Sequence, residues 1–347
     1  MDVQWPLLQY GALLKREAIP YPPPVALTRG RPCSARRTAK HTYSLINYES
    51  QTNAMTSLAK VIDSGRFVVT SELNPPKGTR LDPLFEKADL LKNVVDAFNV
   101  TDSHAARMAM APLAAAHLLK QRGFEPILQI TTRDRNRIAL QGDLLGAYAL
   151  GVENVVFMGG DPPSAGDHPD AKPVFDVFSS MMLNAACAME EGHDMAGNAL
   201  DGNPRFCLGA VANPGADDLD EEIRRMEEKL KAGARFFQTQ AIFEPAKFER
   251  FARAIEDLDA TVLAGIIPIK SPKMARYMNT RVPGIHVPDA LIEKLSDAQD
   301  RREVSVEIAA GIASEIRGMC RGLHVMAIGW EEMIPKILEA AGVTREN

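Results

Sequence analysis

Eight short apolar runs, most of them separated by one interval, constrain this chain more than any other feature. They cover residues 67–73, 96–102, 125–132, 154–160, 206–212, 235–242, 262–269 and 322–329. The first four runs begin 29 residues apart, and so do the fifth and sixth. That interval is about the length of one strand–helix unit. Because the runs are almost continuously apolar, without strict alternation, they predict parallel strands that are covered on both faces.

The segments between these runs carry the signs of helices. Residues 81–93 and 106–121 have apolar side chains at helical spacing, and residues 216–232 place four apolar side chains on one stripe. Three of the segments are followed by a glycine where a helix C-cap is expected, at Gly123, Gly151 and Gly233. Alternation of strands and helices predicts an α/β protein with a parallel sheet.

Eight such units within residues 55–347 predict a closed (β/α)8 barrel, the TIM barrel, as a single domain. The alternative is an open, doubly wound sheet. That fold lacks its usual support here, because no G-x-G-x-x-G motif follows the first strand. Two long insertions are expected, at 161–205 after the fourth strand and at 270–321 before the eighth.

Residues 1–54 differ from the rest of the chain. They hold seven Lys or Arg, three Asp or Glu and six prolines, with no sustained helical or strand period. We interpret them as an irregular N-terminal extension, either a disordered basic tail or a non-native leader that ends before Met55. An organelle transit peptide is the weaker alternative, because Glu17 and the prolines interrupt its pattern.

The composition excludes several classes of protein. The chain has no uncharged apolar run of 18 residues, so we expect no membrane span. Its net charge of −5 gives nucleic acid no electrostatic attraction. Its four cysteines lie far apart, which suits reduced thiols in a cytoplasmic protein. The seven histidines form no metal-binding spacing and no G-x-S-x-G elbow is present, so we expect neither a metal site nor a serine nucleophile.

Polar residues gather where the predicted strands end, which is where a TIM barrel builds its active site. Glu72 stands out because a carboxylate in an apolar strand is costly unless it is paired or functional. Burial would raise its pKa and suit it to general acid catalysis. The alternative is an ion pair with a Lys or Arg of the barrel.

The other strand ends supply weaker candidates. Asp161 follows two glycines that let a ligand approach the backbone, although a turn or N-cap aspartate is the plain alternative. Gln129 and Gln240 are amides in apolar strands, which could equally be satisfied core amides. Arginines stand at 133, 135 and 137, and we interpret them as a solvated helix start capped by Asn136 in preference to a phosphate site. Such a set, without metal or nucleophile, suits a reaction whose reagent is an organic cofactor.

Four motifs, in order, resemble the methylenetetrahydrofolate reductase family over about residues 60–341. They are T-S-E-L-N-P-P-K-G at 70–78, F-M-G-G-D-P-P at 157–163, N-P at 213–214 and K-L-K-A-G-A-R-F-F-Q-T-Q at 229–240. The resemblance implies an FAD-containing TIM barrel that interconverts 5,10-methylenetetrahydrofolate and 5-methyltetrahydrofolate in methionine biosynthesis. It also implies a homo-oligomer that takes electrons from NADH, NADPH or a partner protein.

The resemblance also implies roles for individual residues. Glu72 matches the acid that protonates folate N10, and Asp161 matches the aspartate near the flavin and the pterin. Gln240 and Met278 match positions that contact folate or nicotinamide. The positions matched to FAD contacts are Thr101, Asp102, His104, Gln129, Gly159, Gly160, Asp161, Asn213, Glu222, Arg225 and Lys229.

Some residues depart from the family pattern. Met278 replaces an aromatic residue or Leu of some members, Trp330 replaces an Arg, and the fifth strand lacks a tyrosine. These changes leave the electron donor and the recognition of the folate tail open. Two other functions also stay open: a flavin-free pterin-binding methyltransferase barrel, and a non-catalytic subunit of a one-carbon or electron-transfer complex.

Overall fold

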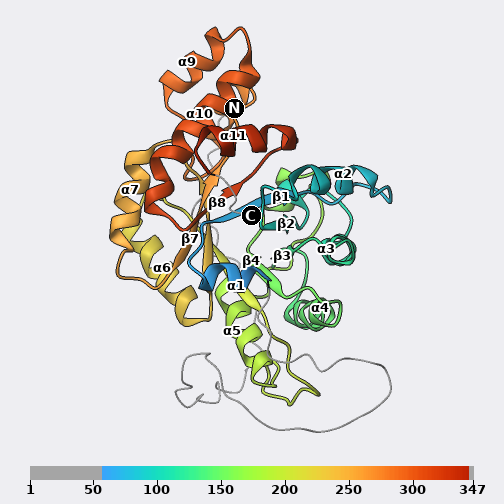
Figure 1. Cartoon of the computed structure of the whole chain (residues 1–347). Coiled ribbons are helices and arrows are strands. Elements are labelled where there is room, and N and C mark those ends of the chain that lie inside the picture. The colour runs from blue at the N-terminus through green and yellow to red at the C-terminus, as the bar shows by residue number, and fades with distance from the viewer. Residues whose placement is uncertain (1–56, 344–347) are drawn as a thin grey trace. The chain divides into compact units, whose positions relative to one another are not determined.

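Eight parallel strands close into one barrel in the order in which they follow one another along the chain (Figure 1). The computed structural model describes residues 57–343, so the predicted extension at 1–54 lies outside the described part. The strands are β1 (Val68–Leu73), β2 (Ala97–Val100), β3 (Pro126–Thr131), β4 (Asn154–Met158), β5 (Cys207–Ala212), β6 (Phe236–Ala241), β7 (Thr261–Ile266) and β8 (Gly322–Val325). All eight predicted strands and the predicted TIM barrel are therefore confirmed.

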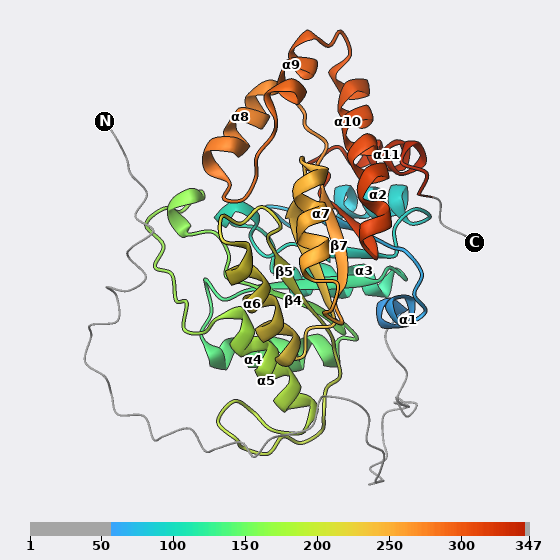
Figure 2. The same ribbon diagram turned by 90° about the vertical axis from the view of Figure 1, so that its left-hand side faces the viewer.

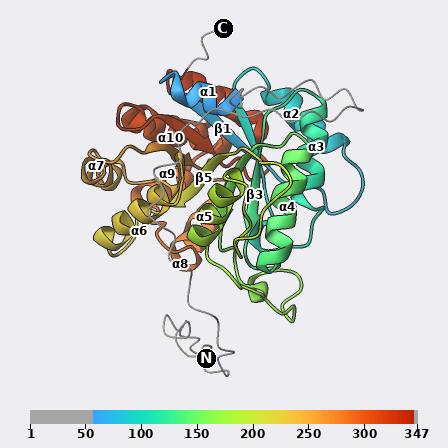
Figure 3. The ribbon, with the colours of Figure 1, turned by 90° about the horizontal axis from the view of Figure 1, so that it is seen from below.

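Helices surround the strands, as Figure 3 shows for α3 to α7. They are α1 (Ser57–Asp63), α2 (Asp82–Leu91), α3 (Pro112–Gln121), α4 (Arg137–Ala149), α5 (Ser179–Glu190), α6 (Leu219–Lys231), α7 (Pro245–Ala254), α8 (Pro272–Arg281), α9 (Asp289–Asp297), α10 (Arg301–Ile316) and α11 (Ile334–Ala340). Short 3-10 turns η1 (His104–Ala106), η2 (Pro163–Ala165), η3 (Arg317–Met319) and η4 (Glu331–Met333) lie in the loops. In Figure 2, α9 stands clear of the strands between α8 and α10. No helix in residues 57–343 is both long and apolar enough to cross a membrane.

The predicted helix at 106–121 is wrong in its first part. Helix α3 begins only at Pro112, and the residues before it form η1 and an irregular stretch. Proline disfavours helical backbone in the residue that precedes it but suits the first helical turn, so α3 starts at the proline. The predicted C-cap glycines are confirmed, because Gly123, Gly151 and Gly233 all have φ between 76° and 102°.

The interior of the barrel is apolar at its amino-terminal end. Side chains from seven strands form one cluster there, among them Ile127, Phe236 and Leu263, and Leu58 and Ala59 of α1 pack against it. Helix α1 therefore seals this end of the barrel. Position 209 on β5 is a glycine because the Phe236 ring occupies the neighbouring space, and a Cβ there would lie 2.4 Å from that ring.

We expect Gly209→Ala to destabilise the protein by about 1–3 kcal/mol, because the added methyl group overpacks the sealed end. Gly142→Ala is the matched control, since a Cβ at that position of α4 meets no atom within 4 Å. It should stabilise the protein by up to about 1 kcal/mol through helix propensity. Urea denaturation measures both changes. Equal effects of the two substitutions would contradict the proposed packing of Phe236.

Candidate active site

Above the apolar seal, the barrel interior turns polar. Six side chains from five strands fill this region: Thr70, Glu72, Asn99, Gln129, Gln238 and His324. The side chains of every member except Glu72 are buried, and the Glu72 side chain is 15% exposed. Because one end of the barrel is sealed, this polar set can meet a ligand only at the carboxyl-terminal end of the strands.

The lower part of the polar set is a chain of hydrogen bonds. The Asn99 amide donates to Gln238 Oε1 at 2.7 Å, and Gln238 Nε2 donates back to Asn99 Oδ1 at 2.8 Å. Gln238 Nε2 also lies 3.3 Å from Thr70 Oγ1, which lies 2.9 Å from His324 Nδ1. These buried groups are thus satisfied by one another.

The upper part of the set holds Glu72. Gln129 Nε2 donates to Glu72 Oε1 at 3.3 Å, and His324 Nε2 lies 3.6 Å from the same oxygen. Burial raises the pKa of Glu72, but the groups that face it lower it by more. These are His324, through its hydrogen bond and, when doubly protonated, its charge, then the charge of His104 and the hydrogen bond from the Gln129 amide. The net pKa of Glu72 in the ligand-free protein is below its ordinary value.

This result corrects the expectation of a raised pKa at Glu72. The expectation counted desolvation and omitted the donors that face the carboxylate. The alternative of an ion pair with a Lys or Arg of the barrel is also wrong, because the partner is a histidine contributed by β8. The sequence reasoning missed Thr70, Asn99 and His324 as site residues. Asn99 and His324 interrupt apolar strands in the same way as Glu72, so that signal could have identified them.

Asp161 lies at the same end of the barrel as Glu72, in the loop after β4. Its side chain is exposed and makes no hydrogen bond or ion pair within residues 57–343. It is not the N-cap of η2, because Pro162 occupies that position. Gly160 has φ of 86°, and a Cβ there would come within 3.0 Å of Thr131. Gly160 therefore lets the loop run close to β3, and the exposed Asp161 carboxylate is free to meet a ligand.

The three arginines after β3 are not a solvated helix start. The Arg133 side chain is 3% exposed, pairs with Asp134 at 2.6 Å and donates to the Asp161 carbonyl at 3.1 Å. Arg135 pairs with Asp102 and Asp143, and Arg137 pairs with Asp176 at 2.7 Å. Each guanidinium has a carboxylate partner from a distant or adjacent loop position, which sequence spacing alone does not reveal. The predicted cap is confirmed, since Asn136 accepts hydrogen bonds from two amides of α4 at 3.1 Å.

Of the predicted cofactor residues that follow β2, Asp102 points into the fold. Its carboxylate accepts hydrogen bonds from the Thr131 amide at 2.8 Å and the Thr131 hydroxyl at 2.9 Å, besides the contact with Arg135. Thr101 donates instead to Asn74 at 2.8 Å. The two neighbours therefore differ in role: Asp102 links the end of β2 to β3, and Thr101 faces the barrel mouth.

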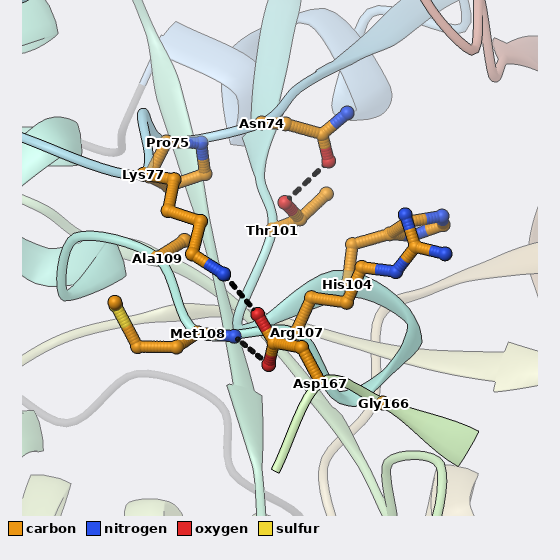
Figure 4. A pocket seen from close by; sticks show the side chains of 10 residues that line it. All are labelled: Asn74, Pro75, Lys77, Thr101, His104, Arg107, Met108, Ala109, Gly166 and Asp167. Carbon is orange, nitrogen blue, oxygen red and sulfur yellow. Dashed lines mark hydrogen bonds and ion pairs between the residues drawn. The ribbon is translucent and has the colours of Figure 1, made fainter.

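Thr101 and His104 line a cavity of about 460 Å³ between the loops that follow β1, β2 and β4 (Figure 4). Asp167 bridges these loops, because it pairs with Lys77 and accepts the Met108 amide at 3.0 Å. These donors, Lys77 first, hold the pKa of Asp167 well below its usual range. The remaining lining residues are Asn74, Pro75, Arg107, Ala109 and Gly166.

The wall of this cavity contains strained backbone. Ser103, Ala105 and Ala106 all have φ of 52° or 53°, in the left-handed region that non-glycine residues rarely adopt. Gly166 packs against them so closely that a Cβ would lie 1.8 Å from the Ala106 carbonyl oxygen. Strain of this kind concentrates at functional sites, where the surrounding structure enforces it.

Helix α6 directs two of its three predicted FAD contacts inward. Glu222 is buried and accepts the Asn213 amide at 2.9 Å, while Lys229 Nζ donates to the Val211 carbonyl at 2.6 Å. Burial lowers the pKa of Lys229. Arg225 is exposed and pairs with Glu221 at 2.9 Å. Val211 O is the only hydrogen-bond partner of the Lys229 ammonium among the described residues, so two of its three donor positions stay available to an anion.

The last two predicted substrate residues, Gln240 and Met278, lie in β6 and α8. Strand β6 has a register shift between Gln238 and Ala241, and the Gln240 side chain accepts the Ala241 amide at 3.0 Å. Met278 is buried in α8. The amide of Gln240 thus keeps its two N–H donors for a ligand, whereas Met278 offers only an apolar surface.

A family model described as methylenetetrahydrofolate reductase matches residues 57–342. Methylenetetrahydrofolate reductase 2 of Schizosaccharomyces pombe is 26% identical over 312 residues, covering 81% of this chain and 46% of the relative. The chain thus spans about half the length of that relative. 5,10-Methylenetetrahydrofolate reductase of Pectobacterium carotovorum is 23% identical and is covered to 93%, against 83% of this chain.

A solved structure shares the fold. It is an uncharacterized Clostridium thermocellum protein that binds two copies of 5-methyl-5,6,7,8-tetrahydrofolic acid. The TM-score is 0.54 at 16% sequence identity, and the match covers 83% of this chain and 99% of that one.

The lowered pKa of Glu72 predicts how it contributes to stability. Since the folded pKa lies below the unfolded one, the contribution is present above about pH 4.3 and is lost as the pH falls through the folded value. The stability advantage of the wild type over Glu72→Gln should therefore shrink as the pH is lowered from neutral. Urea denaturation of the ligand-free protein across this range measures it.

Glu153→Gln is a control of opposite sign, because burial raises the pKa of Glu153 at the other end of β4. Since the folded pKa lies above the unfolded one, the ionised side chain destabilises the folded state and this penalty disappears as the pH falls. The free energy of unfolding of the wild type should therefore rise relative to that of this variant on acidification. A wild-type advantage over Glu72→Gln that grows on acidification would show that the Glu72 pKa is raised.

Proposed function

The chain belongs to the methylenetetrahydrofolate reductase family, and we propose that it reduces 5,10-methylenetetrahydrofolate to 5-methyltetrahydrofolate with the help of FAD. One observation carries the proposal. Glu72 is a mostly buried carboxylate, held by Gln129 and His324, at the same barrel end as the unpaired carboxylate of Asp161. Two carboxylates in such different surroundings suit two roles, one as a proton donor and one as a fixed charge.

Glu72 is the group that would protonate folate N10 and open the five-membered ring. In the ligand-free protein its pKa is lowered, so it must take up a proton before it can act. A ring system bound over the barrel mouth would remove the remaining water from Glu72. That desolvation favours the protonated acid, while Gln129 and His324 keep its oxygen in place.

Asp161 would act through its charge. Ring opening leaves a positive charge on the substrate, and a nearby carboxylate stabilises that charge without moving. The Asp161 side chain makes no hydrogen bond or ion pair within residues 57–343, and the nearby Arg133 guanidinium acts on it through charge alone. Gln240 would use its free N–H groups to orient the pterin or the nicotinamide, and Met278 would supply an apolar contact.

The residues at the mouth fit a flavin. A Cβ at Gly159 would meet no atom within 4 Å, so the backbone there borders open space that a flat ring can occupy. Lys229 offers a half-buried ammonium that suits the diphosphate of FAD. FAD would supply the hydride. Residues proposed to hold it are Thr101, Asp102, His104, Gln129, Gly159, Gly160, Asn213, Glu222, Arg225 and Lys229.

We propose that electrons reach the flavin from NADH, NADPH or a partner protein, and that the protein acts in the cytoplasm as a homo-oligomer. Anaerobic mixing of the purified protein with NADH and then NADPH separates the first two donors. Flavin reduction only after addition of a co-purifying protein would identify the third. A colourless protein that cannot be reconstituted with FAD would favour the flavin-free methyltransferase.

We expect Glu72→Gln to slow oxidation of the reduced flavin by methylenetetrahydrofolate by about a hundredfold or more, the usual contribution of a general acid. The flavin spectrum and flavin reduction by the electron donor should stay close to wild type. Stopped-flow absorbance measures both half-reactions. Glu153→Gln, at the sealed end of the barrel, should leave both rates unchanged. Full folate activity in Glu72→Gln would rule out Glu72 as the acid.

Lys229→Met should weaken FAD binding by about tenfold or more, because a charged hydrogen bond to phosphate is lost. Lys231→Met is the matched control on the same helix, since Lys231 is 76% exposed and pairs with Glu227 at the helix surface. Titration of the apoprotein with FAD, followed by flavin fluorescence, gives both dissociation constants. Similar constants for the two variants would remove Lys229 from the FAD site.

A further inference from the structure

We propose that the buried amide pair of Asn99 and Gln238 acts, through Thr70, to fix which ring nitrogen of His324 carries its proton. The pair would thereby place an N–H against Glu72. Asn99, Gln238 and Thr70 are positioning residues in this proposal, since none of them reaches the substrate. The functional consequence rests on the proposed role of Glu72 as the acid, but the protonation of His324 can be measured without it.

The first step is the orientation of Gln238. Its Oε1 accepts the Asn99 amide at 2.7 Å, and its Nε2 donates to Asn99 Oδ1 at 2.8 Å and to Thr70 Oγ1 at 3.3 Å. An amide nitrogen has two protons, and both are used. Asn99 and Gln238 stand on β2 and β6, four strands apart in the closed barrel, so the pair spans the interior.

The second step passes through Thr70. Its hydroxyl accepts from Gln238, and its single proton is then directed at His324 Nδ1, 2.9 Å away. A nitrogen that accepts a hydrogen bond carries no proton, so neutral His324 must be protonated at Nε2. That nitrogen lies 3.6 Å from Glu72 Oε1. The direction of donation therefore runs from the amide pair to the carboxylate.

The surroundings oppose a reversal of this direction. Asn99, Thr70, Gln238 and His324 are at most 3% exposed, so water has no ready access to exchange partners with them. Beneath them lies the apolar seal that includes Ile127 and Phe236. Reversing the chain requires both amides and the hydroxyl to turn together, because turning one leaves a buried group unsatisfied.

The consequence falls on Glu72. The titratable groups that act on it are His324 and His104, and Gln129 is its other donor. With the proton on Nε2, His324 can donate a hydrogen bond to Glu72 and so stabilises its ionised form. With the proton on Nδ1, a lone pair would face the carboxylate and disfavour it. The amide pair would thus set the pH at which the proposed acid is loaded with its proton.

The direct test is the tautomer of His324 in the full-length protein, read from long-range nitrogen–proton correlations of isotope-labelled histidine. His324→Gln assigns the signal. We expect the Nε2–H form, and the Nδ1–H form would overturn the proposal. This measurement needs neither flavin nor folate. The prediction of the tautomer can therefore fail while the proposed reductase activity holds. Equally, the activity can be absent while the predicted tautomer is found.

Gln238→Glu tests the cause. A carboxylate there can only accept, so Thr70 would donate to it and accept from His324 Nδ1–H, which switches the tautomer. The apparent pKa of the folate half-reaction should then rise by about one pH unit or more, since a hydrogen bond to a charged group is lost. Flavin reduction by the electron donor should not change.

Gln238→Met covers the case in which a buried carboxylate prevents folding. It removes the amide without reversing the chain, so both tautomers should become populated. Asn154→Leu is the matched control, because Asn154 is a buried amide of β4 that bonds to Glu125 and Pro126 at the other end of the barrel. It should lower stability without moving the tautomer or the pH profile. A wild-type tautomer in both Gln238 variants would overturn the proposal.

Discussion

A carboxylate can stay inside this barrel only because two donors from other strands reach it. Glu72 loses most of its hydration there, and an ionised carboxylate without compensation would simply take up a proton. Gln129 from β3 and His324 from β8 replace part of the lost water. His324 depends on closure of the barrel, because β8 lies beside β1 only when the sheet joins its own first strand. The pairing of β8 with β1 therefore both closes the fold and supplies the histidine that contacts Glu72.

The two ends of the barrel differ in composition and in role. Apolar side chains and α1 fill the amino-terminal end, and the Phe236 ring occupies the space that Gly209 leaves open. That seal excludes water from beneath the polar side chains. In such surroundings hydrogen bonds are strong and an unsatisfied polar group is costly. At the open end, strained residues of η1 and the tight contact of Gly166 hold three loops around the mouth. The apolar seal lies at one end and the strained backbone at the other, the distribution expected where a scaffold carries a site.

The sequence predicted what depends on local pattern. Strand positions follow from apolar runs and their interval, and Asn136 and the three glycines identify helix ends, because each of these signals lies within a few residues of the structure it specifies. The pKa of Glu72 could not be predicted in this way. Its direction depends on His324, which is distant in sequence, and on which groups that histidine contacts. The interpretation of the arginines at 135 and 137 as solvated was wrong for the same reason, since their partners Asp102 and Asp176 come from other loops.

The same reasoning explains why a search for costly residues is more informative than a search for motifs. Asn99 and His324 lie in no recognised spacing, yet each places a polar group in an apolar strand and must be satisfied there. Once β1, β2, β6 and β8 are assigned to one closed barrel, few hydrogen-bond partners are available to each buried polar side chain. The number of donors and acceptors then almost determines which side chains bond to each other. Glu72 is the most exposed member of that set, so it is the one that a ligand can reach.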